Sequence, residues 1–484
     1  MMEVRTVDIV VVGFGGAGAC AAIEAHDAGA CVQILEKAPE GGGNTRESGG
    51  TIRQINDWRL AVEHYKAVTQ GTTPTDILEA FAAGVGPLLE WLRETVGATL
   101  VEAALLDGFP RMPVGSSFPA LPGAEALGAR LRVAPGEPGE SGGSALWTSL
   151  KAAVERRGID VRYNAPVRRL VRNGSDSRIT GVVFEDRDNE VTVRASRGVV
   201  LTCGGFASNR DMHRNFIGGV DFHAFGPPGR NTGDGVSMAM EAGADLWHMY
   251  ALAGPFGYKF PEYEAAFAHL MPSAGYIYVD RDAERFINEA EIEYHACALT
   301  ALAFDPLRGR YPRIPAYVIF DEIARQAGPI AFSGAGWNRR FPWSADNTAE
   351  IERGWIKKAD DLESLARLLD LAPGKLAATV AHYNGACDLG HDGLFGRRAE
   401  YLTSLAVPPF YGVAIWPCLL NTQGGPRRSA AAEILSVRGA AIPGLYGAGE
   451  LGSIWGMLYP GAGNLTEALI FGRIAGRNAA GCGA

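Results

Sequence analysis

Several features that define common protein classes are missing from this 484-residue chain. No apolar run approaches the roughly 18 residues that a membrane-spanning helix needs, so the sequence predicts no membrane span. The formal net charge of −9 argues against nucleic-acid binding as a main role. The segment MMEVRTVD leads directly into an apolar strand, and no signal peptide fits before it. We therefore expect a cytoplasmic protein.

The cysteines exclude several kinds of site. All seven are scattered, without a CxxC or CxxCH motif and without the Cys/His spacing of a metal site. The sequence therefore predicts no redox-active disulfide, no c-type haem and no metal centre. Glycine, in contrast, is abundant: 63 residues, clustered where strands turn into helices. That distribution is typical of nucleotide-binding α/β proteins.

The N-terminal region contains a complete βαβ dinucleotide-binding pattern. An apolar strand at residues 9–12 leads into the turn GFGGAG and then into an Ala-rich helix at 19–28. In this pattern Gly13 permits the tight turn, Gly15 lets the backbone approach a pyrophosphate, and Gly18 lets the helix pack on the strand. The positive end of the helix dipole then faces the phosphates.

An acidic residue, Glu36, follows the next predicted strand, residues 31–35, eighteen positions after Gly18. Such a carboxylate can hydrogen-bond a ribose hydroxyl and repels a 2′-phosphate, which favours FAD or NAD over NADP. The following loop, residues 41–50, is rich in Gly, Ser and Thr, and its backbone N–H groups can hold phosphates or the edge of a planar ring. No second complete pattern predicts a separate NAD site.

The rest of the chain indicates an α/β domain interrupted by a second domain. The βα rhythm weakens between about 250 and 415, where Tyr, Trp and Pro are more frequent, and it returns near residue 416. We expect a Rossmann-type domain at 1–250 and 416–484, with an α+β cap domain at 251–415. Residues 104–144 are Gly/Pro-rich and are expected to be irregular. The other expected elements are helical segments at 57–97, 145–157, 236–242 and 464–480, and strands at 160–164, 182–184, 191–193, 199–202 and 444–446.

The closing helix has a start signal of its own. Asn464 is a good N-cap residue, and Glu467 lies three positions later, as in a capping box. The preceding residues 461–463, Gly-Ala-Gly, allow a ligand to approach the helix N-terminus. A helix dipole aimed at the N1/O2 edge of a flavin would stabilise its anionic reduced form.

Taken in order, these motifs resemble the FAD-dependent fumarate reductase/succinate dehydrogenase flavoprotein superfamily, and within it the 3-ketosteroid dehydrogenases. The similar segments are VVVGFGGAGACAA, LEKAPEGGGNTRESGG, LTCGGFASN, NTGDGVSMAMEAGADL, ERFINEA, LNTQGGPR and IPGLYGAGELGS followed by GNLTEALIFGRIAG. The resemblance spans nearly the whole chain. It implies an FAD domain interrupted by a cap domain, with the substrate between the cap and the isoalloxazine ring.

The resemblance also implies which residues contact FAD. They form the phosphate turn, the ribose and pyrophosphate contacts, the adenine contact and the flavin end of the site. These residues are Gly13, Gly15, Gly16, Ala17, Gly18, Glu36, Lys37, Asn44, Thr45, Ser48, Gly49, Gly50, Val167, Thr202, Gly204, Asp234, Glu450, Asn464 and Leu465. The histidine that holds FAD covalently in membrane-bound relatives is missing from the Gly43–Asn44 region, so we expect non-covalent FAD.

The chain departs from fumarate reductases where those enzymes bind and protonate a dicarboxylate. The arginine expected shortly after RFxNE is missing, Asn421 stands where they have histidine, and Pro460 stands where an arginine grips a carboxylate. Instead, YPGAG resembles the YPGPG of ketosteroid Δ1-dehydrogenases. That resemblance implies that the Tyr459 hydroxyl and the Gly463 N–H bind a ketone oxygen, with Tyr294 as the catalytic base.

The expected chemistry is oxidation of a CH–CH bond beside a ketone. A base takes the α-proton, two donors hold the enolate oxygen, and the flavin accepts the β-hydride. For this role Tyr294 would need a lowered pKa. The expected partners are a small hydrophobic ketone, with steroids among the candidates, and an external electron acceptor or donor. Two alternatives remain: an ene-reductase of an unsaturated carbonyl or carboxylate compound, and a flavin-binding protein without catalysis.

Overall fold

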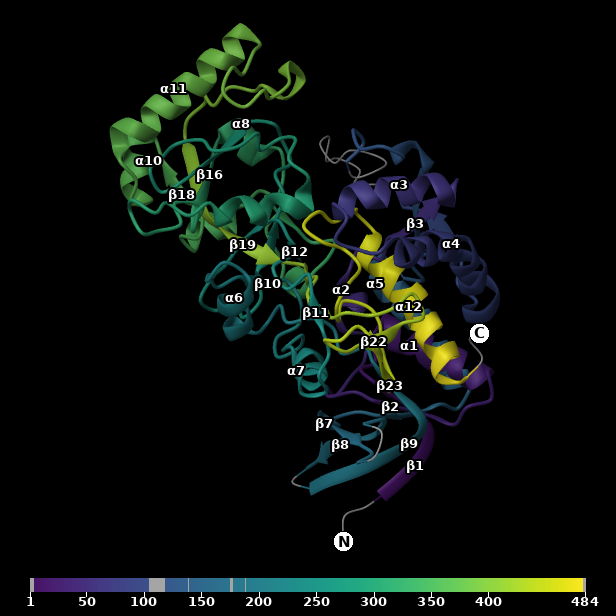
Figure 1. The fold of residues 1–484 in the computed structure, drawn as a ribbon. Coiled ribbons are helices and arrows are strands. Elements are labelled where there is room, and N and C mark those ends of the chain that lie inside the picture. Colours follow the sequence, from purple (N-terminus) through teal and green to yellow (C-terminus); the bar gives the residue numbers. More distant parts are fainter. Residues whose placement is uncertain (1–3, 104–117, 138, 175–176, 188, 482–484) are drawn as a thin grey trace.

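The computed structural model describes residues 4–103, 118–137, 139–174, 177–187 and 189–481. Two lobes are visible in Figure 1, one built on the N-terminal strands and one, in green, formed by the middle of the chain. Within the described residues, no helix combines the length and the apolar character needed to cross a membrane.

The first lobe is built on an eight-stranded sheet with the order β22-β23-β9-β1-β2-β6, to which β8 and β7 add antiparallel strands beside β9. Strand β1 pairs in parallel with β2 on one side and β9 on the other. Ligands of open α/β sheets bind at the carboxyl edge, at the point where neighbouring strands lead to opposite sides. The strands are β1 (Val4–Val12), β2 (Val32–Leu35), β6 (Asp160–Arg162), β7 (Val167–Arg172), β8 (Ile179–Asp186), β9 (Asn189–Leu201), β22 (Glu433–Leu435) and β23 (Ala441–Gly447).

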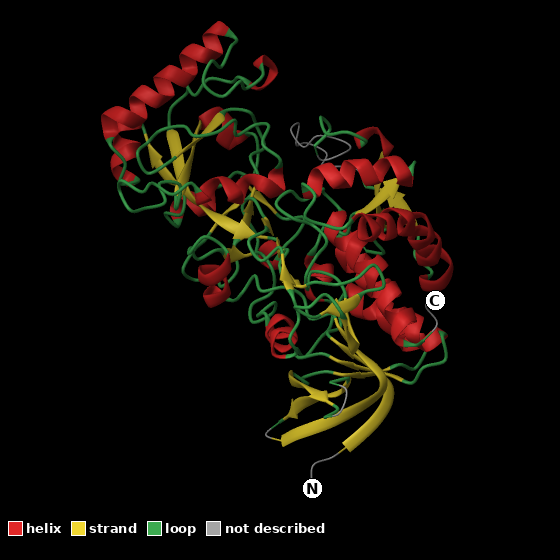
Figure 2. Ribbon diagram, viewed as in Figure 1, coloured by secondary structure: helices red, strands yellow, loops and turns green. Residues whose placement is uncertain are grey.

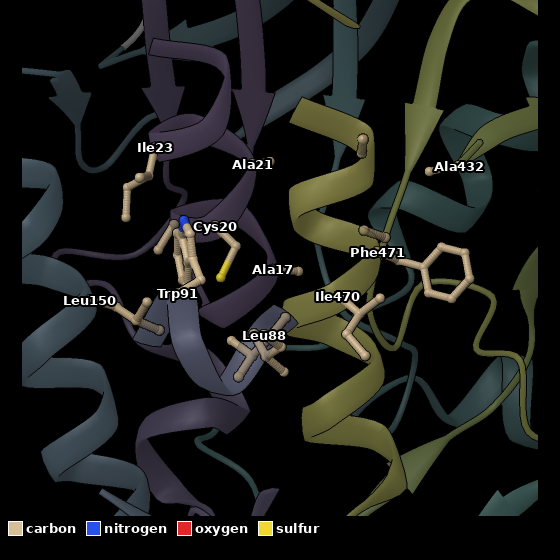
Figure 3. Packing of buried hydrophobic residues seen from close by; sticks show 14 of the residues in the cluster. Ala17, Cys20, Ala21, Ile23, Leu88, Trp91, Leu150, Ala432, Ile470 and Phe471 are labelled. Atoms are coloured by element: carbon tan, nitrogen blue, oxygen red, sulfur yellow. The ribbon is translucent and has the colours of Figure 1, made fainter. Parts of the chain in front are cut away.

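Most helices of the first lobe gather on one side of this sheet, as Figure 2 shows. Their apolar faces form the largest hydrophobic core, which includes Cys20, Ile23, Leu88, Trp91 and Leu150 (Figure 3). The helices of the first lobe are α1 (Gly16–Asp27), α2 (Gly43–Glu47), α3 (Trp58–Thr69), α4 (Thr75–Trp91), α5 (Gly142–Arg156), α6 (Arg210–Phe216), α7 (Asp234–Glu241) and α12 (Gly463–Ala479).

The first and last helices, α1 and α12, pack unusually closely because glycines face backbone. A Cβ on Gly472 would lie 2.5 Å from the Ala17 carbonyl oxygen, and one on Gly476 would lie 2.2 Å from that of Ala21. Figure 3 shows Ala17 and Ala21 on α1 beside α12. This packing places the start of α12 at the same end of the sheet as the β1–α1 turn.

The second lobe is a sheet with the order β15-β16-β19-β13-β14-β17, with β10 and β18 also pairing with β19. The expected cap domain begins at residue 251 and ends at residue 415. Strand β19 of this sheet continues past residue 415, and strand β10 comes from before residue 251. The expected division into domains stays a prediction. The strands are β10 (His223–Ala224), β13 (Phe256–Tyr258), β14 (Phe267–His269), β15 (Tyr276–Val279), β16 (Ala316–Asp321), β17 (Ala331–Phe332), β18 (Lys357–Ala359) and β19 (Phe410–Leu419), with helices α8 (Glu322–Gln326), α9 (Thr348–Glu352), α10 (Leu362–Leu368) and α11 (Pro373–Leu389).

Two expectations about local structure are corrected. The stretch 104–144 is not wholly irregular, because Leu127–Val133 forms strand β5 between β3 (Ile52–Ile55) and β4 (Leu100–Glu102). Cross-strand pairing there outweighs the Gly/Pro-rich composition. The strands expected at 191–193 and 199–202 are one continuous strand, β9, because it pairs with β8 along its first half and with β1 along its length.

The close packing of α1 and α12 predicts a strong effect of added side chains. Gly472→Ala and Gly476→Ala should each lower the free energy of unfolding by about 3 kcal/mol, because a Cβ would overlap backbone of α1 that cannot rotate away. Gly385→Ala is the matched control. Gly385 is also in a helix interior, with nothing near its would-be Cβ, so alanine should stabilise by about 0.5–1 kcal/mol. Thermal unfolding of the three variants measures this; equal melting temperatures would contradict the close-packing argument.

Candidate active site

One cavity of about 950 Å³ begins at the carboxyl edge of β1 and β2 and continues to the second lobe. Its size is at the upper end of small-molecule sites, which span about 300–1,000 Å³. Eighteen of the nineteen predicted FAD contacts line it; the exception is Gly18. They are Gly13, Gly15, Gly16, Ala17, Glu36, Lys37, Asn44, Thr45, Ser48, Gly49, Gly50, Val167, Thr202, Gly204, Asp234, Glu450, Asn464 and Leu465.

The glycine turn has the geometry that the sequence pattern predicts. Gly13 has φ +101°, and a Cβ there would lie 2.6 Å from the Thr202 carbonyl oxygen. A Cβ on Gly18 would lie 2.0 Å from the Gly13 carbonyl oxygen, so Gly18 allows the helix to pack on the turn rather than facing the cavity. Gly16 donates its N–H to Thr45 Oγ1 over 3.0 Å, which ties the turn to α2, a short helix within the segment 41–50 that the sequence predicts to be a loop.

The acidic residue after β2 is held by backbone. The Glu36 carboxylate accepts the N–H groups of Phe14 at 2.8 Å and Ala38 at 2.9 Å, and it lines the cavity. Nearby, Lys37 Nζ lies 2.9 Å from Asp234 Oδ2 and also bonds Thr232. These side chains are oriented before any ligand binds, as a ribose site requires.

At the other end of the predicted cofactor site, Glu450 collects three hydrogen bonds. Its carboxylate accepts Asn44 Nδ2 at 2.9 Å, Asn421 Nδ2 at 3.1 Å and the Thr422 N–H at 3.2 Å. Burial raises the pKa of Glu450 to about 7. Asn44 Oδ1 and Asn464 Nδ2, both on cavity-lining residues, are buried and have no hydrogen-bond partner in the part of the chain that the structure describes.

Beyond these residues the cavity reaches the second lobe, where Tyr459 lies close to His295. The two rings meet edge to face, with centroids 4.8 Å apart. Burial raises the pKa of Tyr459 to about 12, so its hydroxyl stays protonated at neutral pH. Arg130 and Arg132 of strand β5 also line this part, and alternate residues of a strand share a face. The apolar lining includes Phe225, Ala268, Phe332 and Leu420.

The Gly463 N–H donates to the Pro460 carbonyl oxygen over 2.8 Å within a tight turn, and Gly463 is not among the described residues that line the cavity. Its role as the second ketone donor stays a prediction that this geometry does not favour. Two expectations about the start of α12, the Asn464 N-cap and the capping box, are wrong. The N-cap is Ala462, in the left-handed region at φ +68°, rather than Asn464. Glu467 makes no capping box, because its carboxylate pairs with buried Arg428.

The lowered pKa expected for Tyr294 is also wrong. Tyr294 lines the cavity, but burial raises the pKa of its hydroxyl, which lies 3.5 Å from the His269 carbonyl oxygen. Desolvation is the largest cause of this shift, and the negative charge of Glu293 also raises the pKa of Tyr294. The role of Tyr294 as base stays a prediction that this environment does not favour.

The sequence interpretation missed four residues at the substrate end: Arg130, Arg132, Glu293 and His295. Arg130 and Arg132 are two positions apart, so on a strand their guanidinium groups share one face. This signal was missed because strand β5 was not predicted. Glu293 and His295 follow RFINEAEI and pair with each other, His295 Nδ1 lying 2.7 Å from Glu293 Oε1. The Glu-x-His spacing was the signal for this pair.

Comparison with known proteins gives the family. The family model described as FAD binding domain matches residues 8–465, so the chain belongs to this family. It is 28% identical to "Probable fumarate reductase Ifc3" of Shewanella frigidimarina, covering 98% of this chain and 75% of that protein. It is 26% identical to 3-oxosteroid 1-dehydrogenase of Mycobacterium tuberculosis, covering 98% of each.

The fold matches a solved structure over its whole length. The crystal structure of 3-ketosteroid Δ1-dehydrogenase from Sterolibacterium denitrificans superposes with a TM-score of 0.84, at 24% identity, covering 99% of this chain and 100% of that chain. The expected fold class, a Rossmann-type FAD-binding domain interrupted by an α+β cap domain, is confirmed. Together with the family match, these relatives define the chain as an FAD-dependent oxidoreductase that acts on CH–CH bonds.

The residues present fit FAD. The open glycine turn leaves space for a pyrophosphate, and Glu36 is positioned for a ribose. The unpartnered Asn464 Nδ2 and Asn44 Oδ1 match a ring edge that carries both acceptors and a donor, as the flavin pyrimidine does. The cofactor would therefore lie along the cavity from Glu36 to Asn464.

The absence of an attachment histidine at Gly43 and Asn44 predicts dissociable FAD. Acid or heat denaturation of the yellow holoprotein should release one FAD per chain into the supernatant, because no covalent bond retains it. Absorbance of the separated supernatant and pellet measures this. Colour retained by the precipitated protein would contradict non-covalent binding.

Proposed function

We propose that this enzyme transfers hydrogen at the CH–CH bond next to the carbonyl of a small hydrophobic ketone. The observation that carries the proposal is Tyr459, a buried hydroxyl donor on the wall where the predicted flavin site meets the second lobe. Phe225, Ala268 and Phe332 supply an apolar surface for the body of such a substrate. The Sterolibacterium enzyme, whose fold is similar, was solved with 1,4-androstadiene-3,17-dione, which supports a steroid as one candidate.

In this proposal, Tyr459 binds the substrate carbonyl and stabilises its developing charge, and the apolar residues hold the body of the substrate. Tyr459 donates its O–H to the substrate carbonyl, and that bond strengthens as the oxygen becomes an enolate. The apolar walls exclude water, which increases the strength of this hydrogen bond. FAD, when bound, supplies the hydride acceptor or donor. The external electron acceptor or donor and the cytoplasmic location remain predictions from the sequence.

A second candidate is reduction of an unsaturated carboxylate, and the position of Arg130 and Arg132 favours it. A guanidinium binds a carboxylate through two parallel hydrogen bonds. Both arginines lie on one strand, so they support a single carboxylate on one side of the cavity. Arg427 and Arg428 are not among the described residues that line the cavity, and they pair with Asp245 and Glu467 instead.

Removing the Tyr459 hydroxyl should slow flavin reduction. Tyr459→Phe is expected to lower the single-turnover rate with a saturating ketone about 10²-fold, because one oxyanion donor is lost while the ring volume is kept. Tyr446→Phe, in the same lobe but outside the cavity lining, should keep the wild-type rate. Anaerobic stopped-flow bleaching of bound FAD measures both. A wild-type rate in Tyr459→Phe, at full FAD content, would contradict a hydrogen bond between Tyr459 and the ketone oxygen.

Fumarate and succinate should be poor substrates. Pro460 and Asn421 replace the residues that would grip a second carboxylate, and each lost hydrogen bond to a charged group weakens binding by about 1.5–3 kcal/mol. The reduced enzyme should therefore turn over fumarate ~10- to 100-fold more slowly than an unsaturated ketone or monocarboxylate. Reoxidation of a reduced dye measures this. Rapid fumarate turnover would show that Arg130 and Arg132 suffice for a dicarboxylate.

A further inference from the structure

His295, which lines the cavity on the side of the second lobe, is paired with Glu293. Both carboxylate oxygens of Glu293 contact His295. Oε1 lies 2.7 Å from His295 Nδ1, and Oε2 accepts the His295 backbone N–H at 2.8 Å. The second bond makes Glu293 the N-cap of the 3₁₀ helix Tyr294–Leu302. The His295 carbonyl oxygen accepts the Gly254 N–H at 2.7 Å. The pair is therefore fixed by backbone at both ends.

This arrangement determines which ring nitrogen of His295 can react. An ionised carboxylate only accepts hydrogen bonds, so Nδ1 must carry the hydrogen and Nε2 has the free lone pair in the neutral ring. Nε2 makes no hydrogen bond with any residue that the structure describes. By contrast, His269 has Tyr258 and Tyr278 at its two nitrogens, and His248 has the carbonyl oxygens of Ser453 and Thr72.

The surroundings place this nitrogen in the substrate region. His295 lines the cavity together with Tyr459, whose ring it contacts edge to face, and its ring centroid lies 5.6 Å from that of Tyr294. Arg130, on the opposite lobe, interacts electrostatically with both Glu293 and Tyr459. A carbonyl bonded to Tyr459 would thus have its α-carbon in the neighbourhood of His295.

We propose that His295, held and polarised by Glu293, is the residue that exchanges a proton with the α-carbon of the substrate. This role rests on the proposed function. In oxidation, the α C–H bond breaks and its proton forms an N–H bond at Nε2. The electron pair becomes the enolate, whose oxygen Tyr459 holds. The enolate then collapses to the unsaturated ketone as the β-hydrogen leaves as hydride, for which bound FAD would supply the acceptor. Reduction reverses each step, with His295 as the acid.

Glu293 acts as a positioning residue in this scheme. Its negative charge stabilises the imidazolium that forms when His295 takes the proton, and its hydrogen bond keeps the ring in the productive tautomer. Tyr294 lies between the two in sequence, but its hydroxyl is directed to the His269 carbonyl oxygen at 3.5 Å. The proposal therefore makes Tyr294 dispensable for proton transfer.

Solvent exchange isolates the proton step. Holoenzyme is reduced anaerobically, so that bound FAD could not accept a hydride, and is incubated in D₂O with a saturated 3-ketosteroid, which has no C=C bond that the reduced enzyme could reduce. Mass spectrometry then measures deuterium at the α-carbon. His295→Gln should lower the exchange rate ~10²-fold or more, because an amide cannot take up the proton. His382→Gln, which changes an exposed histidine on α11, should retain it, and Tyr294→Phe tests the alternative base.

Two further measurements separate chemistry from structure. Added imidazole should restore exchange in His295→Ala but not in Tyr459→Phe, a response that a purely structural histidine would not give. Glu293→Gln should lower exchange at least ~10-fold and shift the ring-nitrogen NMR signals of His295, because an amide can reverse the tautomer.

The outcomes distinguish the two proposals. Wild-type enzyme that neither exchanges deuterium nor oxidises or reduces any ketone tested overturns the proposed function, and the role of His295 with it. Wild-type exchange that persists in His295→Gln at full FAD content overturns the role of His295 alone. If Tyr294→Phe is the variant that loses exchange, the base is Tyr294.

Discussion

The close contact between the first and last helices determines where the active site forms. Gly472 and Gly476 let α12 lie against the α1 backbone, and Gly18 lets α1 pack on the glycine turn. Residues separated by more than four hundred positions therefore meet around one cavity: the phosphate turn from β1–α1, and Tyr459 and Asn464 from the start of α12. Larger side chains at these glycines would separate the phosphate end of the site from its reacting end.

The cofactor half of the site could be predicted from the sequence because backbone conformation defines it. Gly13 needs a positive φ, Gly18 needs the absence of a Cβ, and Glu36 follows a parallel strand; each requirement leaves a local signal. Apart from the short helices α2 and α6, the helices and parallel strands of the first lobe were predicted for the same reason, since their apolar periodicity is local. The continuous β9 was not, because long-range pairing joins its two halves.

The substrate half depends on side-chain directions that no local pattern specifies. Whether Gly463 offers its N–H depends on the turn that begins at Pro460, and whether Tyr294 is acidic depends on its burial. Arg130 and Arg132 reach the cavity only because β5 pairs with β3 and β4. The Glu293–His295 pair results from the capping geometry of a short 3₁₀ helix.

The central claim is that a carbonyl compound exchanges hydrogen with FAD in the cavity between Tyr459 and His295. The most direct measurement is an anaerobic titration of the holoenzyme with saturated ketones, and of the reduced holoenzyme with their unsaturated counterparts, followed by flavin absorbance. The account predicts that a ketone bleaches the oxidised flavin or that its unsaturated counterpart restores the colour of the reduced flavin. Flavin that responds to dicarboxylates and to no ketone would contradict it.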